Sequence, residues 1–530
     1  MTSPRVMTKP LGGNPLAIAA MAGTAPTGWY EPQPRDVESW RERIDAVRSH
    51  FPTKWLESLY PAIEPTGAAK DRLNAVADGK GVVVTTGQQP GLFGGPIYTL
   101  SKALSALAFA DVLQQATGVP VAPVFWAATD DTDFREASST AISLIGGAQQ
   151  LRIDHQEPLG QPMAAMPLGD VSAQLDALAR SAGSAIDRWP IELLEQSYRP
   201  EETIGSAYVA FLRALLSPLG ISVIDASSAA TRAAAKPVLV RALERATEIA
   251  KAVRARSTEM ESAGFGPQVQ EVPGLSLVFS GASGGRKRVP IKAAETQKIA
   301  DDLGPNVLLR PVVERAILPT ATYIGGPAEI AYFGQLGVIA DAIGAARPAI
   351  VPRWSCTIIE PHVEEILEKL YLLPEDLQDP HEAEARVARS RLPKDVLDEL
   401  NAMRTVVESR MDALADAVVD THAPIGQNVT GGLRANLMRR LDRFERRLIA
   451  GAKRQYANTM TEIGTARGSL YPLGKPQERA LNFVPLLARY GSALRDEMLV
   501  AAAAHARNLI DGSSAPHAAV QNSEPIRVSG

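Results

Sequence analysis

Residues 81–104, GVVVTTGQQPGLFGGPIYTLSKAL, decide the fold class of this chain. The β-branched run 82–84 is typical of a buried strand, a glycine-rich turn follows it, and helix-period apolar residues begin near Tyr98. A strand that enters a helix through such a turn is typical of a nucleotide-handling α/β domain. Backbone N–H groups of the turn and of the helix start can bind a phosphate or a carboxylate. The turn matches neither a Walker A motif nor a dinucleotide fingerprint, so a purely structural turn is the alternative.

The composition narrows the classes of partner. The 530 residues suffice for two or three domains, and 55 basic against 59 acidic residues give no reason to expect nucleic acid or a membrane surface as partner. No apolar run approaches the roughly 20 residues that span a bilayer. Pro10, Gly12 and Gly13 interrupt the short N-terminal apolar patch, so we expect no signal peptide and a cytoplasmic protein. Cys356 is the single cysteine and is expected to be a buried apolar residue.

Strand-like and helix-like runs alternate over residues 1–373, which predicts a parallel sheet flanked by helices. Pro237 is expected to kink or split the third of the helices given below. Residues 268–291 predict a β-hairpin inserted into this core. The expected strands are 82–86, 121–126, 221–224, 321–324 and 349–352, and the expected helices include 98–116, 207–216 and 229–255.

Two long helices are predicted within residues 374–465. Apolar residues recur at spacings of three and four from Val396 to Val418 and again from Leu433 to Leu448. The segment 422–432 between them contains a proline and three glycines, so the helices should fold back as an antiparallel coiled-coil arm.

The surface of this arm has alternative interpretations. Its apolar stripe covers either a partner or the arm's own subdomain. The basic residues between Arg434 and Arg454 form either a solvated face or a surface for phosphate, a dimer partner or RNA. Beyond the arm, residues 466–510 are expected to be a helical segment that packs on the core, and residues 511–530 are expected to be disordered.

Asp130, Asp131 and Asp133 follow the expected strand 121–126 and are the predicted catalytic residues. Carboxylates at the C-terminal end of a parallel strand face the crevice where such folds bind ligands. They can hold an ammonium group, act as a general base or bind a metal, and their mutual repulsion can raise the pKa of one of them. The alternative is a solvated turn with helix-capping aspartates.

The segment 323–332, YIGGPAEIAY, is the second predicted site. Its two glycines allow close approach of a ligand, Pro327 favours a helix start, and Glu329 then contacts an amine or a sugar hydroxyl, or only complements the helix dipole. The triplet Gly-Gly-Pro recurs at 94–96, so we expect two helix starts to face one crevice. The predicted substrate-binding residues, each of which has a surface or capping role as its alternative, are Gln88, Gln89, Gly94, Gly95, Tyr98, Lys102, Arg310, Tyr323, Gly325, Gly326, Glu329 and Arg353. The seven histidines show no zinc-ligand spacing, so no metal ligand set is predicted.

Several long sequence segments, in the same order along the chain, resemble those of the bacillithiol biosynthesis cysteine-adding enzyme family, BshC. They are residues 16–30, 87–103, 120–134, 306–333, 348–360 and 470–479. The resemblance implies a Rossmann-like core related to class I nucleotidyltransferases, with connecting insertions at about 140–205 and 260–305. It also implies a homodimer that forms through the helical arm.

The reaction that the resemblance implies is amide-bond formation between L-cysteine and the glucosamine nitrogen of glucosaminyl malate. Activation of the cysteine carboxylate suggests ATP, with Mg²⁺ to neutralise the triphosphate, although ATP-independent ligation stays open. The attacking amine needs a general base. Tyr98, Lys102, Arg310 and Arg353 would then face malate and phosphate groups.

Thr132 stands where the family has a histidine between the acidic positions, so a catalytic role of that histidine cannot be carried over. The departure leaves two alternatives open. One is a different amide ligase or nucleotidyltransferase on the same scaffold, and the other is a catalytically silent dimeric binding protein.

Overall fold

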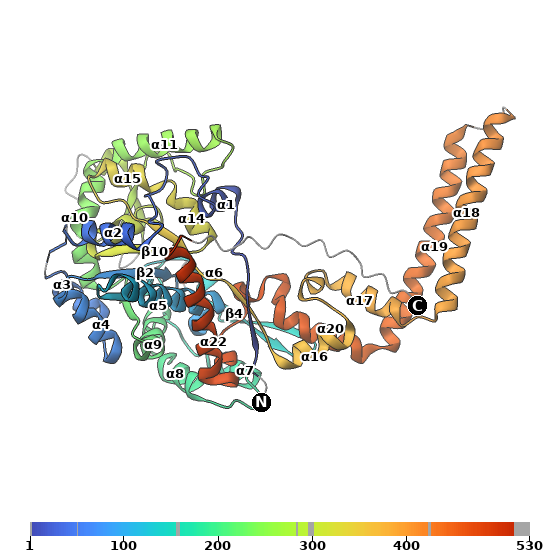
Figure 1. Ribbon diagram of the computed structural model, residues 1–530, viewed down its shortest axis with the longest axis horizontal. Coiled ribbons are helices and arrows are strands. Elements are labelled where there is room, and N and C mark those ends of the chain that lie inside the picture. The colour runs from blue at the N-terminus through green and yellow to red at the C-terminus, as the bar shows by residue number, and fades with distance from the viewer. Residues whose placement is uncertain are drawn as a thin grey trace. The chain divides into compact units, whose positions relative to one another are not determined.

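The computed structural model describes residues 3–49, 51–52, 54–154, 160–281, 285–294, 302–421 and 426–512. The chain forms two compact units (Figure 1). The first, here called the core unit, comprises Met1–Ile142, Gln150–Ile358 and Gln477–Gly530. The second, called the arm unit, comprises Ser143–Gln149 and Ile359–Pro476. The expected arm, 374–465, lies within the arm unit, and its limits as a separate domain stay a prediction.

A five-stranded parallel sheet forms the centre of the core unit. Its strands are β2 (Val82–Gln88), β3 (Val121–Ala127), β6 (Ser222–Asp225), β10 (Thr320–Gly325) and β11 (Ile350–Pro352), which confirms the predicted strands. Their order in space is β11-β10-β2-β3-β6, and all neighbours are parallel. Counted along the chain as first to fifth and read from β6, this is the order 3-2-1-4-5 of a Rossmann-like sheet. The winding reverses between β2 and β10, and ligands bind such sheets outside the carboxyl ends of the strands at this point.

Helices cover both faces of this sheet because its strands are apolar on both sides. Val82 and Val84 pack into a cluster with Trp40 and Phe109, whereas Val83 packs on the other face with Leu59. Successive side chains of a strand point to opposite faces, so the β-branched run supplies both layers.

The remaining elements complete the two units. The helices of the core unit are α1 (Pro15–Met21), α2 (Val37–Ser49), α3 (Trp55–Ile63), α4 (Gly67–Asp78), α5 (Ile97–Thr117), α6 (Phe134–Ala137), α7 (Ser172–Ser181), α8 (Trp189–Ser197), α9 (Ile204–Leu216), α10 (Ala229–Glu244), α11 (Ala246–Ser262), α12 (Ile291–Ala294), α13 (Arg310–Ile317), α14 (Pro327–Phe333), α15 (Leu336–Ala342), α21 (Gln477–Ala480) and α22 (Val484–Ile510). The helices of the arm unit are α16 (Pro361–Leu370), α17 (Pro380–Ser390), α18 (Lys394–Asp420), α19 (Gln427–Gln455) and α20 (Ala457–Leu470). Two small pairs of strands are β1 (Arg5–Thr8) with β12 (Cys356–Ile359), and β4 (Ser139–Leu144) with β5 (Gly147–Arg152).

The predicted helices at 98–116 and 207–216 are confirmed as α5 and α9, but the predicted split at Pro237 is wrong. Helix α10 continues through Pro237, and the chain breaks instead at Arg245, where φ is −107° and ψ is 20°. A proline removes one backbone hydrogen bond from a helix. Burial of Val238, Leu239 and Leu243 on the same helix outweighs that loss.

The inserted hairpin is confirmed. Strand β7 (Leu275–Ser280) pairs with β8 (Lys287–Pro290) in antiparallel fashion, and β9 (Leu303–Pro305) adds a third strand that the sequence analysis missed. This small sheet supplies one wall of the cavity described below.

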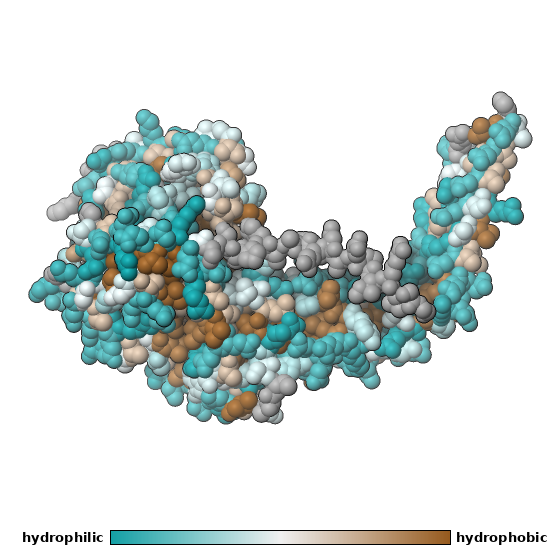
Figure 2. All heavy atoms as spheres, viewed as in Figure 1, coloured by the Kyte–Doolittle hydropathy of each residue, from teal (hydrophilic) through white to brown (hydrophobic). Residues whose placement is uncertain are grey.

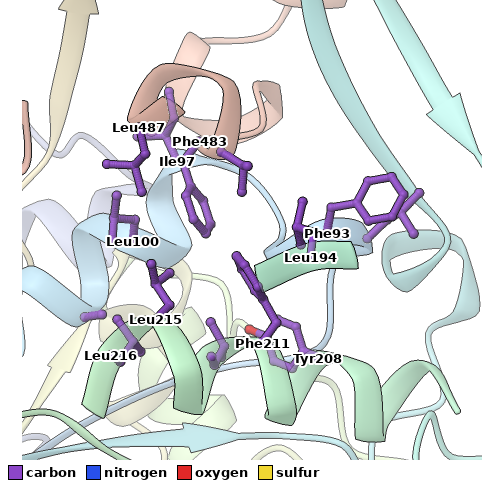
Figure 3. Close-up of a cluster of buried hydrophobic side chains, with 14 of the residues drawn as sticks. Phe93, Ile97, Leu100, Leu194, Tyr208, Phe211, Leu215, Leu216, Phe483 and Leu487 are labelled. Carbon is purple, nitrogen blue, oxygen red and sulfur yellow. The ribbon is translucent and has the colours of Figure 1, made fainter. Parts of the chain in front are cut away.

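An aromatic cluster fills the space beneath the glycine-rich turn (Figure 3). Phe93 from the turn, Phe211 from α9 and Phe483 just before α22 are fully buried there. The rings of Phe211 and Phe483 stack with centroids 6.2 Å apart. The turn is therefore part of the hydrophobic core.

The arm unit contains the predicted antiparallel helix pair. Arg404 pairs with Asp442 at 2.6 Å, and Arg434 pairs with Asp412 at 2.7 Å, so the residue number falls along α19 as it rises along α18. Helix α19 begins at Gln427, so the predicted loop through residue 432 is too long. Its residues 422–425, like the tail 513–530, lie outside the described part of the chain. Among the helices that are described, none is both long and apolar enough to cross a membrane.

Candidate active site

A cavity of about 580 Å³ lies at the carboxyl ends of β2, β3 and β10, where the winding of the sheet reverses. Gly87 reaches it from β2, Trp126 from β3 and Tyr323 from β10. The hairpin insertion, α14 and α21 complete its walls. The predicted site residues that line it are Gln88, Gln89, Tyr98, Lys102, Asp130, Asp131, Arg310, Tyr323, Gly326, Glu329 and Arg353.

The structure places the other predicted residues elsewhere. Gly94 and Gly95 are buried in the core, where the Gly94 N–H donates to the Tyr198 hydroxyl at 3.0 Å. Gly325 packs against a side chain of β11, and Asp133 caps α6 by accepting the Glu136 N–H at 3.1 Å. Helices α5 and α14 both reach the cavity, but the glycines before α5 do not face it, because the aromatic cluster occupies that side.

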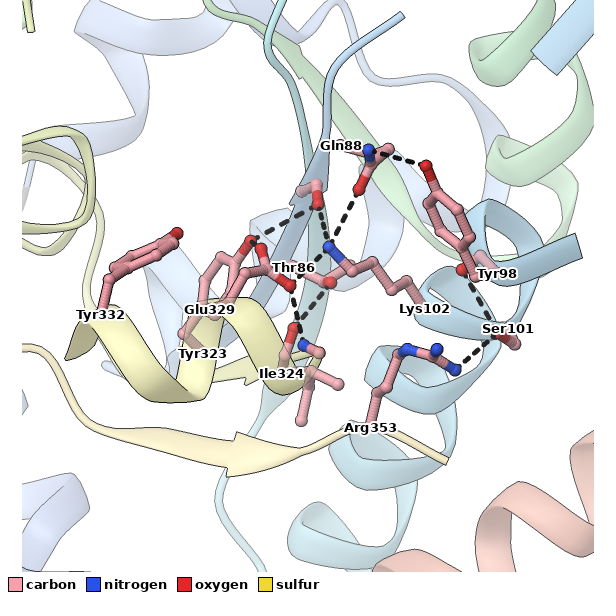
Figure 4. A network of polar contacts seen from close by, with 12 residues as sticks. Thr86, Gln88, Tyr98, Ser101, Lys102, Tyr323, Ile324, Glu329, Tyr332 and Arg353 are labelled. Carbon is pink, nitrogen blue, oxygen red and sulfur yellow. Dashed lines mark hydrogen bonds and ion pairs between the residues drawn. The ribbon is translucent and has the colours of Figure 1, made fainter. Parts of the chain in front are cut away.

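Lys102 is a buried ammonium group whose hydrogen-bond donors are all used by the protein (Figure 4). Its Nζ donates to Gly87 O at 2.8 Å and to Gln88 Oε1 at 3.0 Å, and it pairs with Glu329 Oε2 at 2.6 Å. Burial lowers the pKa of Lys102, and the Glu329 carboxylate opposes this effect. An ammonium group has three donors, so Lys102 is a fixed part of the cavity wall.

Glu329 is equally well satisfied. Its Oε1 accepts the Tyr323 hydroxyl at 2.6 Å, and its Oε2 accepts the Gly326 N–H at 2.7 Å, as expected for a residue in the first turn of α14 (Figure 4). Burial opposes ionisation of Glu329, but the Lys102 ammonium and the Gly326 N–H outweigh it and lower its pKa. Glu329 is therefore an ionised, fully hydrogen-bonded group and a poor proton acceptor.

Arg310 is held beside this pair. Its guanidinium donates to Glu314 at 2.7 Å and to the Tyr332 hydroxyl at 3.1 Å, and it lies 5.2 Å from the centroid of the Tyr323 ring. Burial raises the pKa of Glu314 to about 6, although the charge of Arg310 opposes the rise. The positive charge of Arg310 is thus oriented by Glu314 and by two tyrosines of the cavity wall.

Asp130 lies in the cavity wall beside Arg286. Arg286 donates to the backbone carbonyl of Asp130 and to that of Pro305, and its guanidinium lies 3.6 Å from the Asp130 carboxylate. Burial raises the pKa of Asp130, Arg286 and Arg310 oppose the rise, and Asp131 adds to it.

The other two aspartates stabilise the turn. Asp131 Oδ1 accepts the Asp133 N–H at 2.8 Å, and Asp133 caps α6. Thr132, the departure from the family pattern, lies between them and lines the cavity.

Sequence reasoning missed several residues of this site. Glu136 accepts hydrogen bonds from Tyr98 at 2.8 Å and from the amides of Gln88 and Gln89. Its position three residues after Asp133 is the signal that could have identified it. Arg286 comes from the inserted hairpin. Arg479 comes from the segment 470–479, in which no site residue was predicted.

The donor set of the cavity fits an anionic ligand. Its basic side chains are Lys102, Arg286, Arg288, Arg310, Arg353 and Arg479. The buried Nε of Arg286 has no hydrogen-bond acceptor among the described residues, so it is an unused donor. Phosphate or carboxylate oxygens match such groups. The described residues contain no group of three histidine, cysteine or acidic side chains suited to a metal ion, so we derive no step through Mg²⁺.

Comparisons with known proteins agree with the Rossmann-like fold of the core. Residues 23–354 match the family described as "Bacillithiol biosynthesis BshC, N-terminal Rossmann-like domain", and residues 356–508 match "Bacillithiol biosynthesis BshC, C-terminal coiled-coil domain". A Koribacter versatilis protein named "Putative cysteine ligase BshC" is 31% identical over 441 residues, which cover 79% of this chain and 81% of the relative. A Solibacter usitatus protein of the same name is 29% identical over 483 residues, which cover 87% and 90%.

Proposed function

This chain belongs to the BshC family of bacillithiol biosynthesis, and on that premise we propose that it is a cysteine ligase that joins L-cysteine to glucosaminyl malate. The names of the relatives support ligase activity. The observation that carries the proposal is the cavity at the reversal of the sheet, where several basic side chains surround Asp130. The basic groups fit the carboxylates of the substrates, and Asp130 fits the amine.

We assign the role of general base to Asp130. The glucosamine nitrogen must lose a proton when it attacks the activated cysteine carbonyl. Asp130 accepts this proton, the new C–N bond forms, and the leaving group of the activated carboxyl departs. Glu329 is unsuited because Lys102, Tyr323 and the Gly326 N–H already occupy its oxygens. Asp130 combines a pKa raised by burial with a place in the cavity wall, and a raised pKa makes a carboxylate a stronger base.

We also propose ATP as the activator of the cysteine carboxylate. When bound, a triphosphate supplies a leaving group that the free carboxylate lacks. Arg286 and Arg310 would hold its oxygens, because both line the cavity and Arg286 retains an unused N–H. Their charges also oppose the rise in the pKa of Asp130 that burial causes.

The experiment is a mass-spectrometric assay of the purified protein with L-cysteine and glucosaminyl malate, with and without ATP and magnesium. Product that forms only with ATP supports both proposals. Product without ATP retains the ligase and removes ATP. A folded protein that makes no product in either condition contradicts the ligase proposal, and the next variant to test is then T132H, which restores the family residue.

We further propose that the arm joins two copies of the chain in a homodimer. Several apolar side chains of α18 and α19 are exposed on it, among them Val406 at 58%, Phe444 at 53% and Leu433 at 47% (Figure 2). A coiled-coil domain with such side chains is suited to burying them against a second copy. Light scattering of the full chain should give a dimer, and F444E should shift the mass toward the monomer. A monomeric wild-type chain would contradict this proposal.

We place the reaction in the cytoplasm, where ATP and reduced cysteine are available. The single cysteine of the chain, Cys356, is buried and unpaired, so the fold depends on no intramolecular disulfide.

A further inference from the structure

Helix α21 returns the chain from the arm unit to the core unit, and two buried side chains fix it there. Gln477 accepts the Ile358 N–H and donates to the Ile358 carbonyl, both at 2.8 Å. Glu478 accepts hydrogen bonds from both terminal nitrogens of Arg353 at 2.6 and 3.0 Å and from the Ser355 hydroxyl at 2.9 Å. The position of the next residue, Arg479, is therefore set by the sheet edge that forms the cavity.

Each of the other basic residues of the cavity has at least one protein acceptor, although Arg286 keeps an unused Nε–H. Lys102 pairs with Glu329 and Arg310 with Glu314, Arg353 pairs with Glu478, and Arg286 and Arg288 donate to backbone carbonyls. Within the described part of the chain, Arg479 is the lining cation that contacts no carboxylate, carbonyl or hydroxyl acceptor. Its side chain is exposed, so its donors are open to a ligand.

Arg479 also acts on the cavity electrostatically. Burial raises the pKa of Tyr98 well above its usual value, and the charge of Arg479 opposes this rise. Tyr98 lines the same cavity and is hydrogen-bonded to Glu136 at 2.8 Å. Arg479 and Tyr98 therefore line one cavity, so a ligand there meets both the Arg479 charge and the Tyr98 hydroxyl.

We propose that Arg479 binds a carboxylate of the malyl group and thereby selects the acceptor substrate, an inference that rests on the proposed function. A guanidinium offers two parallel N–H groups that match a carboxylate. The malyl carboxylates keep their charge throughout the reaction, whereas the cysteine carboxylate loses its charge when it is activated. Arg479 has no acceptor among the residues that the structure describes, so it is suited to pair with a malyl carboxylate, which stays charged throughout the reaction.

The test compares R479Q and R479K with wild type in steady-state kinetics, with K475Q as the matched control. Lys475 is an exposed cation of the same segment that does not line the cavity. R479Q should raise KM for glucosaminyl malate by about 10- to 100-fold, as expected for one lost charge-assisted contact. KM for cysteine and for ATP should stay within about 3-fold. R479K should show an intermediate effect, because lysine keeps the positive charge but lacks the two parallel N–H groups of a guanidinium.

A second acceptor separates binding from a structural effect. Methyl glucosaminide has the reacting amine but no carboxylate, so wild type and R479Q should use it equally well. Unchanged KM for glucosaminyl malate, or a rise confined to cysteine or ATP, would overturn the inference.

Direct binding keeps this test separate from the ligase proposal. If wild type makes no bacillithiol, the ligase proposal fails, and calorimetry with glucosaminyl malate still decides the role of Arg479. Weaker binding by R479Q than by K475Q supports the inference, and equal binding by the two overturns it.

Discussion

The triplet Gly-Gly-Pro occurs before two helices of the core unit and has a different role in each place. At 94–96 it packs against the aromatic cluster, and Gly94 adopts a φ of +84°. At 325–327 it lies at the reversal of the sheet, and Gly326 adopts an ordinary φ of −86° while its N–H binds Glu329. The first turn is built for packing, and the second positions the charges of the cavity.

The comparison shows that the groups next to a glycine-rich turn determine its role. A methyl group on Gly94 would lie 2.5 Å from the Phe211 ring, whereas a methyl group on Gly326 would have no neighbour closer than 3.4 Å. Packing therefore requires the first glycine, and geometry permits a side chain at the second.

The largest expected effect is on the cavity side of this comparison. D130N should lower kcat by about 10²- to 10⁴-fold, because a general base contributes that much to proton transfer. D133A, which removes a helix cap, should lower the free energy of unfolding by about 1 kcal/mol and change kcat little. Steady-state assays at matched folded fraction check both. Equal loss in the two variants would show that Asp130 only supports the turn.

Breaking the second turn should also cost stability. E329Q removes the buried charge that pairs with Lys102, and breaking such a pair costs about 3–5 kcal/mol. Denaturant unfolding measures the change. The double variant K102M/E329Q should recover part of the loss because no uncompensated charge remains. A single variant as stable as wild type would contradict the fixed role of this pair.

Breaking the first turn should reduce stability without changing the chemistry. G94A should lower the free energy of unfolding by about 3 kcal/mol, since the methyl group meets two aromatic rings and the backbone is left-handed. G326A, the matched substitution in the second turn, should change it by less than about 1 kcal/mol. Activity per folded molecule of G94A should equal that of wild type. Equal destabilisation by the two variants would remove the contrast between the turns.

The smallest expected effect is a shift of the pH profile. Activity requires the ionised Asp130 and should fall as the pH drops through its raised pKa. Of the charged groups that act on Asp130, Arg286 and Arg310 stabilise the ionised form and Asp131 disfavours it. R286M should therefore move the acid limb of kcat/KM to higher pH, and D131N should move it to lower pH. Shifts in the same direction would exclude Asp130 as the group that titrates.

Much of the fold could be predicted from the sequence because apolar periodicity is local. Residues 82–84 predict a two-faced strand, and Pro327 with Glu329 predicts a helix start. The end of α10 could not be predicted, because burial of its apolar face outweighs the effect of Pro237. Likewise, only tertiary packing shows that Gly94 faces Phe211 and Phe483.

The cavity residues that follow strands of the sheet were predicted. Those from segments distant in sequence from these strands were missed. Gln88 ends β2, Asp130 lies in the turn after β3, and both line the cavity. Arg286 and Arg479 come from an insertion and from a helix that follows the arm, so no local pattern connects them to the sheet.

The central claim, that the cavity at the reversal of the sheet binds substrate whereas the first turn belongs to the core, is tested most directly by hydrogen–deuterium exchange. The full chain would be compared with and without glucosaminyl malate. We expect slower exchange in peptides that contain residues 128–132, 326–329 and 477–480, and unchanged exchange at 92–96. Protection at 92–96 without protection at the other three segments would contradict the account.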